Sequence, residues 1–407
     1  MEKKVMIIGA GAGQVPLINL CKQEGLHTYV VSPFGPYPGI ELADTHINED
    51  IYHVDALVEK GRELGIDYVI SDQSDFAVPL VAYIADKLGV PGNKPEVAQT
   101  YSYKSKFRAF CEKNNIPSPK AVEIHNADSL PEGLRFPVVV KPADSQGSRG
   151  ISKVESYTDL KQAVLDAMAY SKKGSVVIEE FFKGREVVCE GFAIDGVYYP
   201  VAFGDRNYFN LEGKFIPSQT IFPSSISTEI EKRIIANERL ITSILKPGFG
   251  TVHSEYLVNE ETGEFVVVES ALRGGGVYIA SDLIPLSVGV ELTEILFLAM
   301  TGQKEKAIEK LGNRIERASA YICFYLNEGR ITSIEGIDKI KSMPHVKKAD
   351  VENLHIGDNV PFIEHKGMRK GPFIVEANSL SELNRYIHDI QSAFSVNIDG
   401  KAGIHWS

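Results

Sequence analysis

FPVVVKPADSQGSRG, residues 136–150, joins a run of apolar residues to a loop rich in Gly and Ser. The apolar run predicts a buried strand that ends on a single lysine, and the loop after it offers free backbone N–H groups. A fixed positive charge beside such donors is what a chain of phosphates requires. Because the lysine precedes the glycines, this is not a Walker loop. The candidates for phosphate binding are Lys141, Ser145, Gly147 and Ser148; taken alone, the alternative is a surface hairpin with a solvated lysine.

A second candidate site lies in VVIEEFFKGRE, residues 176–186. A strand pattern runs here into a short apolar segment that has acids on both sides. Adenine needs backbone donors and acceptors beside apolar walls, and a carboxylate suits the hydroxyl groups of a ribose. The candidates for binding the nucleoside are Glu179, Glu180, Phe182 and Glu186, and the alternative is an edge strand with solvated acids.

A third element combines TVHSE, residues 251–255, with VVVESALRGGG, residues 266–276. Two neighbouring strands joined by a tight turn can place Glu255 and Glu269 side by side on one face. Paired carboxylates form an oxygen site suited to Mg²⁺, whereas a buried like-charge pair without a cation is costly. Arg273 and the glycines after it add a surface of donors for an anionic substrate or intermediate.

The first 95 residues alternate strand and helix patterns, which predicts a parallel sheet covered on both faces. The sequence GAGAGQ, residues 9–14, follows the first strand and resembles a dinucleotide-binding turn. Gln14 occupies the place of the third glycine, however, and the second strand ends in Val31-Ser32 without an acid for a ribose. A nicotinamide-dependent oxidoreductase is therefore the weaker hypothesis. The predicted strands are 5–8, 28–31 and 68–70, and the predicted helices run to 22 and over 54–64 and 76–88.

Beyond a boundary near residues 91–95, the patterns predict a helix over 101–115 and two β-rich hairpin units over 136–151 and 175–201. A helix over 227–245 and strands over 251–258 and 264–270 follow. The last hundred residues predict a small α+β unit with strands at 318–326 and 373–377 and a helix over 380–394.

The composition bounds the class of protein. The chain has 407 residues, 43% hydrophobic and 24% charged, which excludes a disordered or fibrous protein and predicts two or three domains. A net charge of −11 argues against nucleic acid as the main partner. The four cysteines have no paired spacing, which favours free thiols over disulfides or zinc. No apolar stretch is long enough to span a membrane, and no cleavable signal is recognised, so we expect a cytoplasmic protein.

The order of these elements resembles the ATP-grasp superfamily. The resemblance implies a Rossmann-like preATP-grasp domain over 1–95, an ATP-grasp domain over 96–310 with a β-rich lid at about 120–180, and an α+β domain over 311–407. It implies that Lys104 is a second phosphate-contacting lysine, that Glu255 and Glu269 hold Mg²⁺ or Mn²⁺, and that ATP is the nucleotide. Within the superfamily the chain is similar to stand-alone carboxylate–amine ligases, including L-amino-acid ligases. Relatives are often homodimers, which makes a homodimer the expectation.

The resemblance implies that a substrate carboxylate is phosphorylated to an acylphosphate and then coupled to an amine, with Lys141 and Arg273 as the catalytic residues. The last metal-binding strand departs from the superfamily pattern, because Ala271 stands where an asparagine usually binds metal. Ser270, a water or the second oxygen of Glu269 are the candidate replacements. Segments 71–75 and 205–208 are candidates for substrate contacts. The alternatives are activation of bicarbonate or another small carboxylate, and an ATP-binding module that has lost catalysis.

Overall fold

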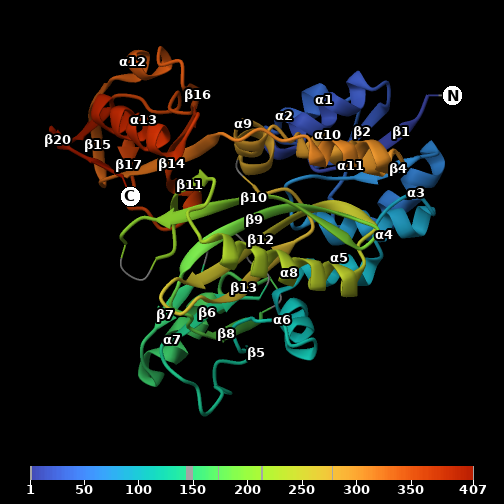
Figure 1. Cartoon of the computed structure of the whole chain (residues 1–407), viewed down its shortest axis with the longest axis horizontal. Coiled ribbons are helices and arrows are strands. Elements are labelled where there is room, and N and C mark those ends of the chain that lie inside the picture. Colours follow the sequence, from blue (N-terminus) through green and yellow to red (C-terminus); the bar gives the residue numbers. More distant parts are fainter. Residues whose placement is uncertain (1, 144–149, 173, 212–213, 277, 407) are drawn as a thin grey trace.

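The computed structural model describes residues 2–143, 150–172, 174–211, 214–276 and 278–406. Three bodies of structure surround a large central sheet (Figure 1). The N-terminal strands and helices lie at the upper right of that view, the C-terminal unit at the upper left, and a small sheet at the bottom. The mixed α/β architecture predicted from the sequence is confirmed.

The N-terminal unit is a parallel sheet with the strand order β3-β2-β1-β4. Alternate residues of β1 pack into two different cores: Val5 and Ile7 face one, and Met6 and Ile8 face the other. Burial on both faces explains why this strand is a continuous apolar run. The elements are β1 (Lys4–Ile8), η1 (Ala12–Gln14), α1 (Val15–Gln23), β2 (His27–Ser32), α2 (Pro38–Leu42), β3 (Thr45–Asn48), α3 (Val54–Leu64), β4 (Tyr68–Ile70) and α4 (Ala77–Leu88).

Strand β3 was missing from the sequence expectation. Its four residues, Thr45–Asn48, are only partly buried and have little apolar content, because β3 lies at the edge of the sheet. An edge strand of this kind has too weak an alternation to be recognised from the sequence.

The predicted helix over 101–115 is wrong as a single element. Two helices, α5 (Pro95–Ser102) and α6 (Lys104–Lys113), are separated at Tyr103, whose backbone is extended (φ −105°, ψ 115°). The apolar residues of both helices pack into one core, so their periodicity resembled that of one helix. The break places Lys104 at the first position of α6.

The lid sheet has the order β5-β8-β6-β7 and is antiparallel throughout. Its strands are β5 (Ala121–Ile124), β6 (Val138–Pro142), β7 (Ser152–Val154) and β8 (Val176–Glu180), and α7 (Tyr157–Met168) packs against them. The pairing of β6 with β7 forms a hairpin, but the predicted range 136–151 is too short, because β7 begins at Ser152. The unit over 175–201 is partly wrong, because β8 pairs with β5 and β6 and only the following strands form the hairpin.

The central sheet has the strand order β13-β12-β9-β10-β11-β14-β18-β16. Its strands are β9 (Arg185–Ile194), β10 (Val197–Tyr208), β11 (Pro217–Phe222), β12 (Phe249–Asn259), β13 (Glu264–Ala271), β14 (Ala318–Leu326), β16 (Val346–Ala349) and β18 (Lys370–Ala377). Because β11 pairs with β14, one sheet crosses the predicted boundary at residue 311. The division into three domains stays a prediction.

Helix α8 (Thr228–Leu245) covers one face of this sheet, and η2 (Ile279–Leu283), α9 (Ile284–Val288), α10 (Leu292–Met300) and α11 (Lys304–Gly312) lead to the C-terminal unit. That unit adds α12 (Ile337–Lys341), α13 (Leu380–Ala393) and a sheet of β15 (Gly329–Glu335), β17 (Asn359–Val360), β19 (Ser395–Ile398) and β20 (Lys401–Ala402). The short η3 (Lys366–Met368) and β21 (Ile404–His405) complete it.

No single helix in the described parts of the chain is long and apolar enough to cross a membrane. The segments 279–288 and 292–300 meet the length and composition criteria only as a pair, and they bend by 110° at the break between them. All four cysteines are buried and free, as the sequence predicted.

A buried carboxyl group in α8 makes the stability of the fold depend on pH. Glu238 is 0% exposed, accepts a hydrogen bond from the Tyr256 hydroxyl (2.6 Å) and has no described partner for Oε2. Burial raises the pKa of Glu238 from 4.5 to about 7. The unfolded chain therefore loses this proton at lower pH than the folded chain. The stabilisation is complete below pH 4.5 and is lost as pH rises to about 7.

Glu238→Gln should remove this dependence, because glutamine stays neutral. We expect the wild-type protein to lose about 3 kcal/mol of unfolding free energy between these pH values through this group, and the variant to lose none of that part. Urea unfolding at both pH values measures the difference. Glu229→Gln, at an exposed position of the same helix, is the matched control. The same pH slope in Glu238→Gln and in the control would contradict the assignment.

Candidate active site

A cavity of about 500 Å³ lies where the N-terminal sheet, the central sheet and the C-terminal unit meet. The turns after β1 and β4 both reach it, as expected for the carboxyl ends of parallel strands. Its described lining residues are Ala12, Gly13, Gln14, Gln73, Ser74, Asp75, Arg206, Pro217, His253, Glu255, Arg273, Gly276, Tyr278, Ser281, Tyr321 and Arg369. Both segments predicted to contact substrate, 71–75 and 205–208, contribute to it.

The two predicted metal carboxylates face each other across neighbouring strands. Glu255 of β12 is paired directly with Glu269 of β13, so their side chains leave the same face of the sheet. Among the described residues no group of three or more His, Cys, Asp or Glu side chains is arranged to hold a metal by itself. Two carboxylates plus oxygens from a ligand are therefore the donor set that this face can offer to a cation.

An arginine bridges Glu255 and Glu186. Nη1 of Arg206 donates to Glu186 Oε1 at 2.7 Å and also to Glu255 Oε1, and the Tyr208 hydroxyl donates to Glu186. Burial, followed by repulsion from Glu255, raises the pKa of Glu186 to about 7. Burial opposes ionisation of Glu255 too, but the charge of Arg206 outweighs it and holds the pKa of Glu255 well below its usual value. Glu186 thus lies beside the carboxylate pair, and its predicted contact with a ribose stays a prediction.

Arg273 is fixed at the wall of the cavity by Asp75. Its Nε and Nη2 donate to the two oxygens of Asp75 at 2.6 and 3.1 Å, and Nη1 donates to the carbonyl of Gly274. Despite burial, the paired charges hold the pKa of Arg273 above and that of Asp75 below their usual values. The N–H of Gly274 donates to the buried carboxyl of Asp72. The predicted segment 71–75 therefore positions the arginine and the glycine run that follows it.

His253 is a site residue that sequence reasoning did not single out. It lies on the same face as Glu255, and its Nδ1 contacts Glu190 while its Nε2 is 3.4 Å from Glu255 Oε1. Burial would lower the pKa of His253, but the charge of Glu190 outweighs it and raises the pKa above the usual value. The alternation of β12 gives the only sequence signal, since residues 253 and 255 must share a face.

A buried ion cluster holds the predicted catalytic lysine. Lys141 Nζ lies 2.6 Å from Glu179 Oε2, and Arg108 Nε lies 2.8 Å from Glu179 Oε1. Burial and the charges of Arg108 and Lys104 lower the pKa of Lys141, and Glu179 opposes that shift. Arg108 also donates to the carbonyl of Val268, the residue before Glu269. One chain of contacts therefore connects Lys141 of β6 to β13, the strand that carries Glu269.

The other predicted nucleotide residues occupy different positions around this cluster. Lys104 is the first residue of α6, and its charge contributes to lowering the pKa values of both Lys141 and Asp75. Glu180 is half-buried, with Arg135 at 3.7 Å, and Phe182 lies in the connection between β8 and β9. Ser145, Gly147 and Ser148 lie outside the described residues, and all of these contacts with nucleotide stay predictions.

Two non-glycine residues with a left-handed backbone line the cavity. Gln73 has φ 54° and Tyr278 has φ 69°. Such conformations cost on the order of 1–3 kcal/mol and persist where the surroundings hold them, often at functional sites. Asp72 Oδ1 accepts from the N–H of Gln73 at 2.8 Å, and Asp350 accepts from the hydroxyl of Tyr278 at 3.3 Å.

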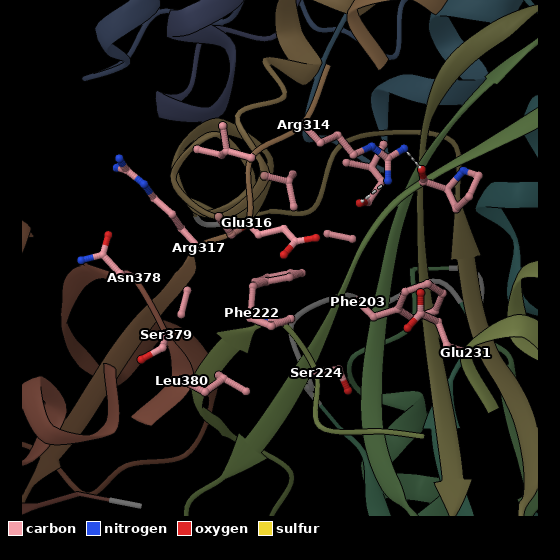
Figure 2. Close-up of a pocket in the computed structure, with 18 of the residues that line it drawn as sticks. Phe203, Phe222, Ser224, Glu231, Arg314, Glu316, Arg317, Asn378, Ser379 and Leu380 are labelled. Carbon is pink, nitrogen blue, oxygen red and sulfur yellow. Dashed lines mark hydrogen bonds between the residues drawn. The ribbon is translucent and has the colours of Figure 1, made fainter. Parts of the chain in front are cut away.

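A second cavity, of about 630 Å³, lies between the start of β10, the end of β11 and the start of α13 (Figure 2). Its described lining includes none of the residues predicted to bind nucleotide, metal or substrate. In Figure 2 the guanidinium of Arg314 turns to backbone carbonyls, which are those of Pro200 and Val201. The first cavity is therefore the candidate active site.

The antiparallel sheet of β5 to β8, the central sheet and the carboxylate pair agree with the ATP-grasp resemblance of the sequence. Residues 104–272 match the family model described as D-ala D-ala ligase C-terminus. The chain is thus similar to ATP-grasp carboxylate–amine ligases, as its sequence motifs indicated.

Individual relatives match parts of the chain or its fold. A formate-dependent phosphoribosylglycinamide formyltransferase from Prochlorococcus marinus is 27% identical over 188 residues, which cover 44% of this chain and 48% of that protein. A D-alanine–D-alanine ligase from Acetivibrio thermocellus is 30% identical over 150 residues, 35% of this chain and 38% of the ligase. The chain thus spans half or less of these two relatives. The crystal structure of an L-amino acid ligase from Bacillus licheniformis has the same fold, with TM-score 0.81, 20% identity and coverage of 98% and 99%.

Proposed function

We propose that the protein uses ATP to activate a substrate carboxylate and couples it to an amine, which gives an amide, ADP and phosphate. The observation that carries this proposal is the register of β12 and β13. It pairs Glu255 with Glu269 at the edge of a cavity that Arg273 also lines. A cation site beside a fixed guanidinium is suited to a phosphoryl donor on one side and a carboxylate on the other.

The residues present fit Mg²⁺ and the phosphates of ATP. Glu255 and Glu269 are paired across β12 and β13 on one face of the sheet, and two adjacent carboxylates suit a divalent cation. Glu255 and Glu269 would hold the ion, and Lys104 and Lys141 would hold the phosphates. When bound, Mg²⁺ supplies charge neutralisation on the transferring phosphoryl group.

The side chains of the cavity then position the reacting groups. A substrate carboxylate oxygen attacks the γ-phosphorus as the bond to the ADP oxygen breaks, which gives an acylphosphate. Arg273 and the N–H groups of the glycine run stabilise charge on the carboxyl oxygens. The amine then attacks the acyl carbon, phosphate leaves, and the amine loses a proton. Closure of the lid sheet over the cavity would exclude water, which protects the acylphosphate from hydrolysis.

The structure around Ala271 bears on which group could replace the asparagine that usually binds metal at this position. Ser270 is a poor substitute ligand, because its hydroxyl accepts from Ser254 at 2.8 Å on the opposite face of the sheet. His253 is the residue paired with Ala271, on the same face as Glu255 and Glu269. Of the three replacements considered, the second oxygen of Glu269 or a water therefore agrees best with this geometry.

The cavity also bears on the alternative of bicarbonate activation. A volume of about 500 Å³ is that of a site for an organic ligand, since pockets for small molecules start at about 300 Å³. This favours an organic carboxylate over bicarbonate. An ATP-binding module without catalysis is tested by the same experiment as the ligase.

The test is ADP release with panels of organic carboxylates, amines and bicarbonate, with mass spectrometry of the product. We expect ADP release that needs both an organic carboxylate and an amine, and Glu269→Gln should lower it by about 10²- to 10³-fold. Glu264→Gln, at the exposed start of the same strand, is the matched control. ADP release with bicarbonate alone would select the carboxylase alternative. Release that Glu269→Gln leaves unchanged would contradict the assigned metal site.

A further inference from the structure

The cavity is lined by three arginines, Arg206, Arg273 and Arg369, and they differ in their partners. Arg273 is bound through two hydrogen bonds to Asp75, and Arg206 to Glu186 and Glu255. Arg369 has no carboxylate in ion-pair contact among the described residues. A positive charge inside a partly buried cavity normally has a counter-ion, because an unpaired charge is costly away from water.

The contacts that Arg369 does make are neutral and fix its orientation. Its Nη1 donates to the carbonyl of Pro217 at 2.8 Å, and its guanidinium carbon lies 5.3 Å from the centre of the Tyr321 ring. The carbonyl and the tyrosine side chain are uncharged partners, so neither supplies a negative charge to the guanidinium. A guanidinium held over a ring in this way is a planar fork of donors, which matches a carboxylate or a phosphate.

A second observation comes from Arg206. Its side chain is 10% exposed, and its Nε is buried without a hydrogen-bond partner among the described residues. Its charge also opposes that of Arg369, so the two guanidinium groups act on each other in one cavity. Every carboxylate known to line the cavity, Asp75 and Glu255, already has an arginine partner. Among the described residues that line the cavity, no acid is left to neutralise Arg369 or to bind the ammonium group of a substrate.

We propose that Arg369, backed by Tyr321, recognises a second anionic group on the substrate, distant from the carboxylate that reacts at Arg273. The substrate class is thus a carboxylate that carries a further carboxylate or a phosphate. This inference rests on the proposed function for the identity of the reacting end. The anion would supply the counter-ion that the described part of the cavity lacks at Arg369.

Calorimetry on the full chain without nucleotide tests this subsite separately from catalysis. The probes are butyrate, succinate and 3-phosphonopropionate, which share a carbon chain of similar length and differ in the second group. We expect the two dianionic probes to bind at least about tenfold more tightly than butyrate, because a charge-assisted hydrogen-bonded pair contributes about 1.5–3 kcal/mol. The stronger of the two identifies the second group as carboxylate or phosphate.

Variants assign the preference to Arg369. Arg369→Gln should reduce the affinity for the dianions to that for butyrate, and Arg369→Lys, which keeps the charge without the fork, should retain part of the preference. Arg385→Gln, at an exposed position of α13, is the control, and thermal unfolding shows that each variant folds. Equal binding of all three probes by the wild type, or an unchanged preference in Arg369→Gln, overturns the subsite.

The two proposals fail in different ways. Ligation of dianionic carboxylates that is no faster than that of monocarboxylates, and that Arg369→Gln leaves unchanged, overturns the subsite and leaves the ligase function standing. Dianion binding that depends on Arg369, in a protein that forms no ADP with any carboxylate and amine, supports the subsite and contradicts the ligase function.

Discussion

Replacement of Lys141 by methionine should lower ADP formation by about 10³-fold, or about 4 kcal/mol in the activation free energy. The ammonium group lies in the lid beside Glu179 and within the influence of Lys104. Under the proposed function a triphosphate brings several negative charges to this place, and Lys141 is a buried cation on β6, the strand before the loop that the sequence predicts to bind phosphate. Stopped-flow or coupled-enzyme measurement of ADP, with the substrates that the wild type accepts, gives the rate.

The variant should remain folded, which makes the loss interpretable. Glu179 keeps its hydrogen bond to Arg108 at 2.8 Å, so the substitution leaves no buried carboxylate without a partner. Lys153→Met, on the neighbouring strand β7 and partly exposed, is the matched control and should retain full activity. Wild-type rates in Lys141→Met would contradict the assignment of Lys141 to the phosphates.

Replacement of Arg273 by alanine should lower amide formation by about 10²-fold or more while ATP affinity changes by about twofold at most. The guanidinium lines the candidate active site, whereas Lys141 is not among the lining residues and pairs with Glu179. Under the proposed function Arg273 acts on the acyl group, so its loss should affect amide formation more than nucleotide binding. Product analysis gives the first quantity, and calorimetry with a non-hydrolysable ATP analogue gives the second.

Arg273→Lys separates the charge of this residue from its geometry. Lysine keeps one positive charge for Asp75 but cannot donate to both of its oxygens as the guanidinium does at 2.6 and 3.1 Å. An intermediate rate is expected. Arg317→Ala, a half-exposed arginine outside this cavity, should have no effect on the rate. Equal losses of ATP affinity and amide formation in Arg273→Ala would contradict its assignment to the substrate.

Local sequence patterns were sufficient to predict those parts of the structure that depend on residues close together in the chain. The pairing of Glu255 with Glu269 follows from two strand patterns and the tight turn between them. The helix over 227–245, observed as α8, was predicted for the same reason, since Ser227 as the N-cap and apolar periodicity are local signals. The division of the predicted helix 101–115 into two helices was not predicted, because both helices bury their apolar residues in a shared core.

The interaction partners of the site residues could be identified only in the folded chain. Arg108 meets Glu179 across 71 residues, Arg273 meets Asp75 across 198, and Arg369 meets Pro217 across 152. No periodicity or spacing encodes such contacts, since each depends on how separate sheets pack. Reasoning about single segments therefore assigned Glu179 to adenine and overlooked that both of its oxygens are occupied by Lys141 and Arg108.

By itself the sequence determined the class of fold, the lysine strand, the carboxylate pair and the arginine after it, because strands and turns place residues that lie close together in the chain. Only the tertiary structure decided which charges neutralise which. Ion pairs form between side chains whose distance is set by packing of whole sheets, and their strength depends on burial. That is why the uncompensated charge of Arg369, and with it the proposed substrate class, became visible only in the folded protein.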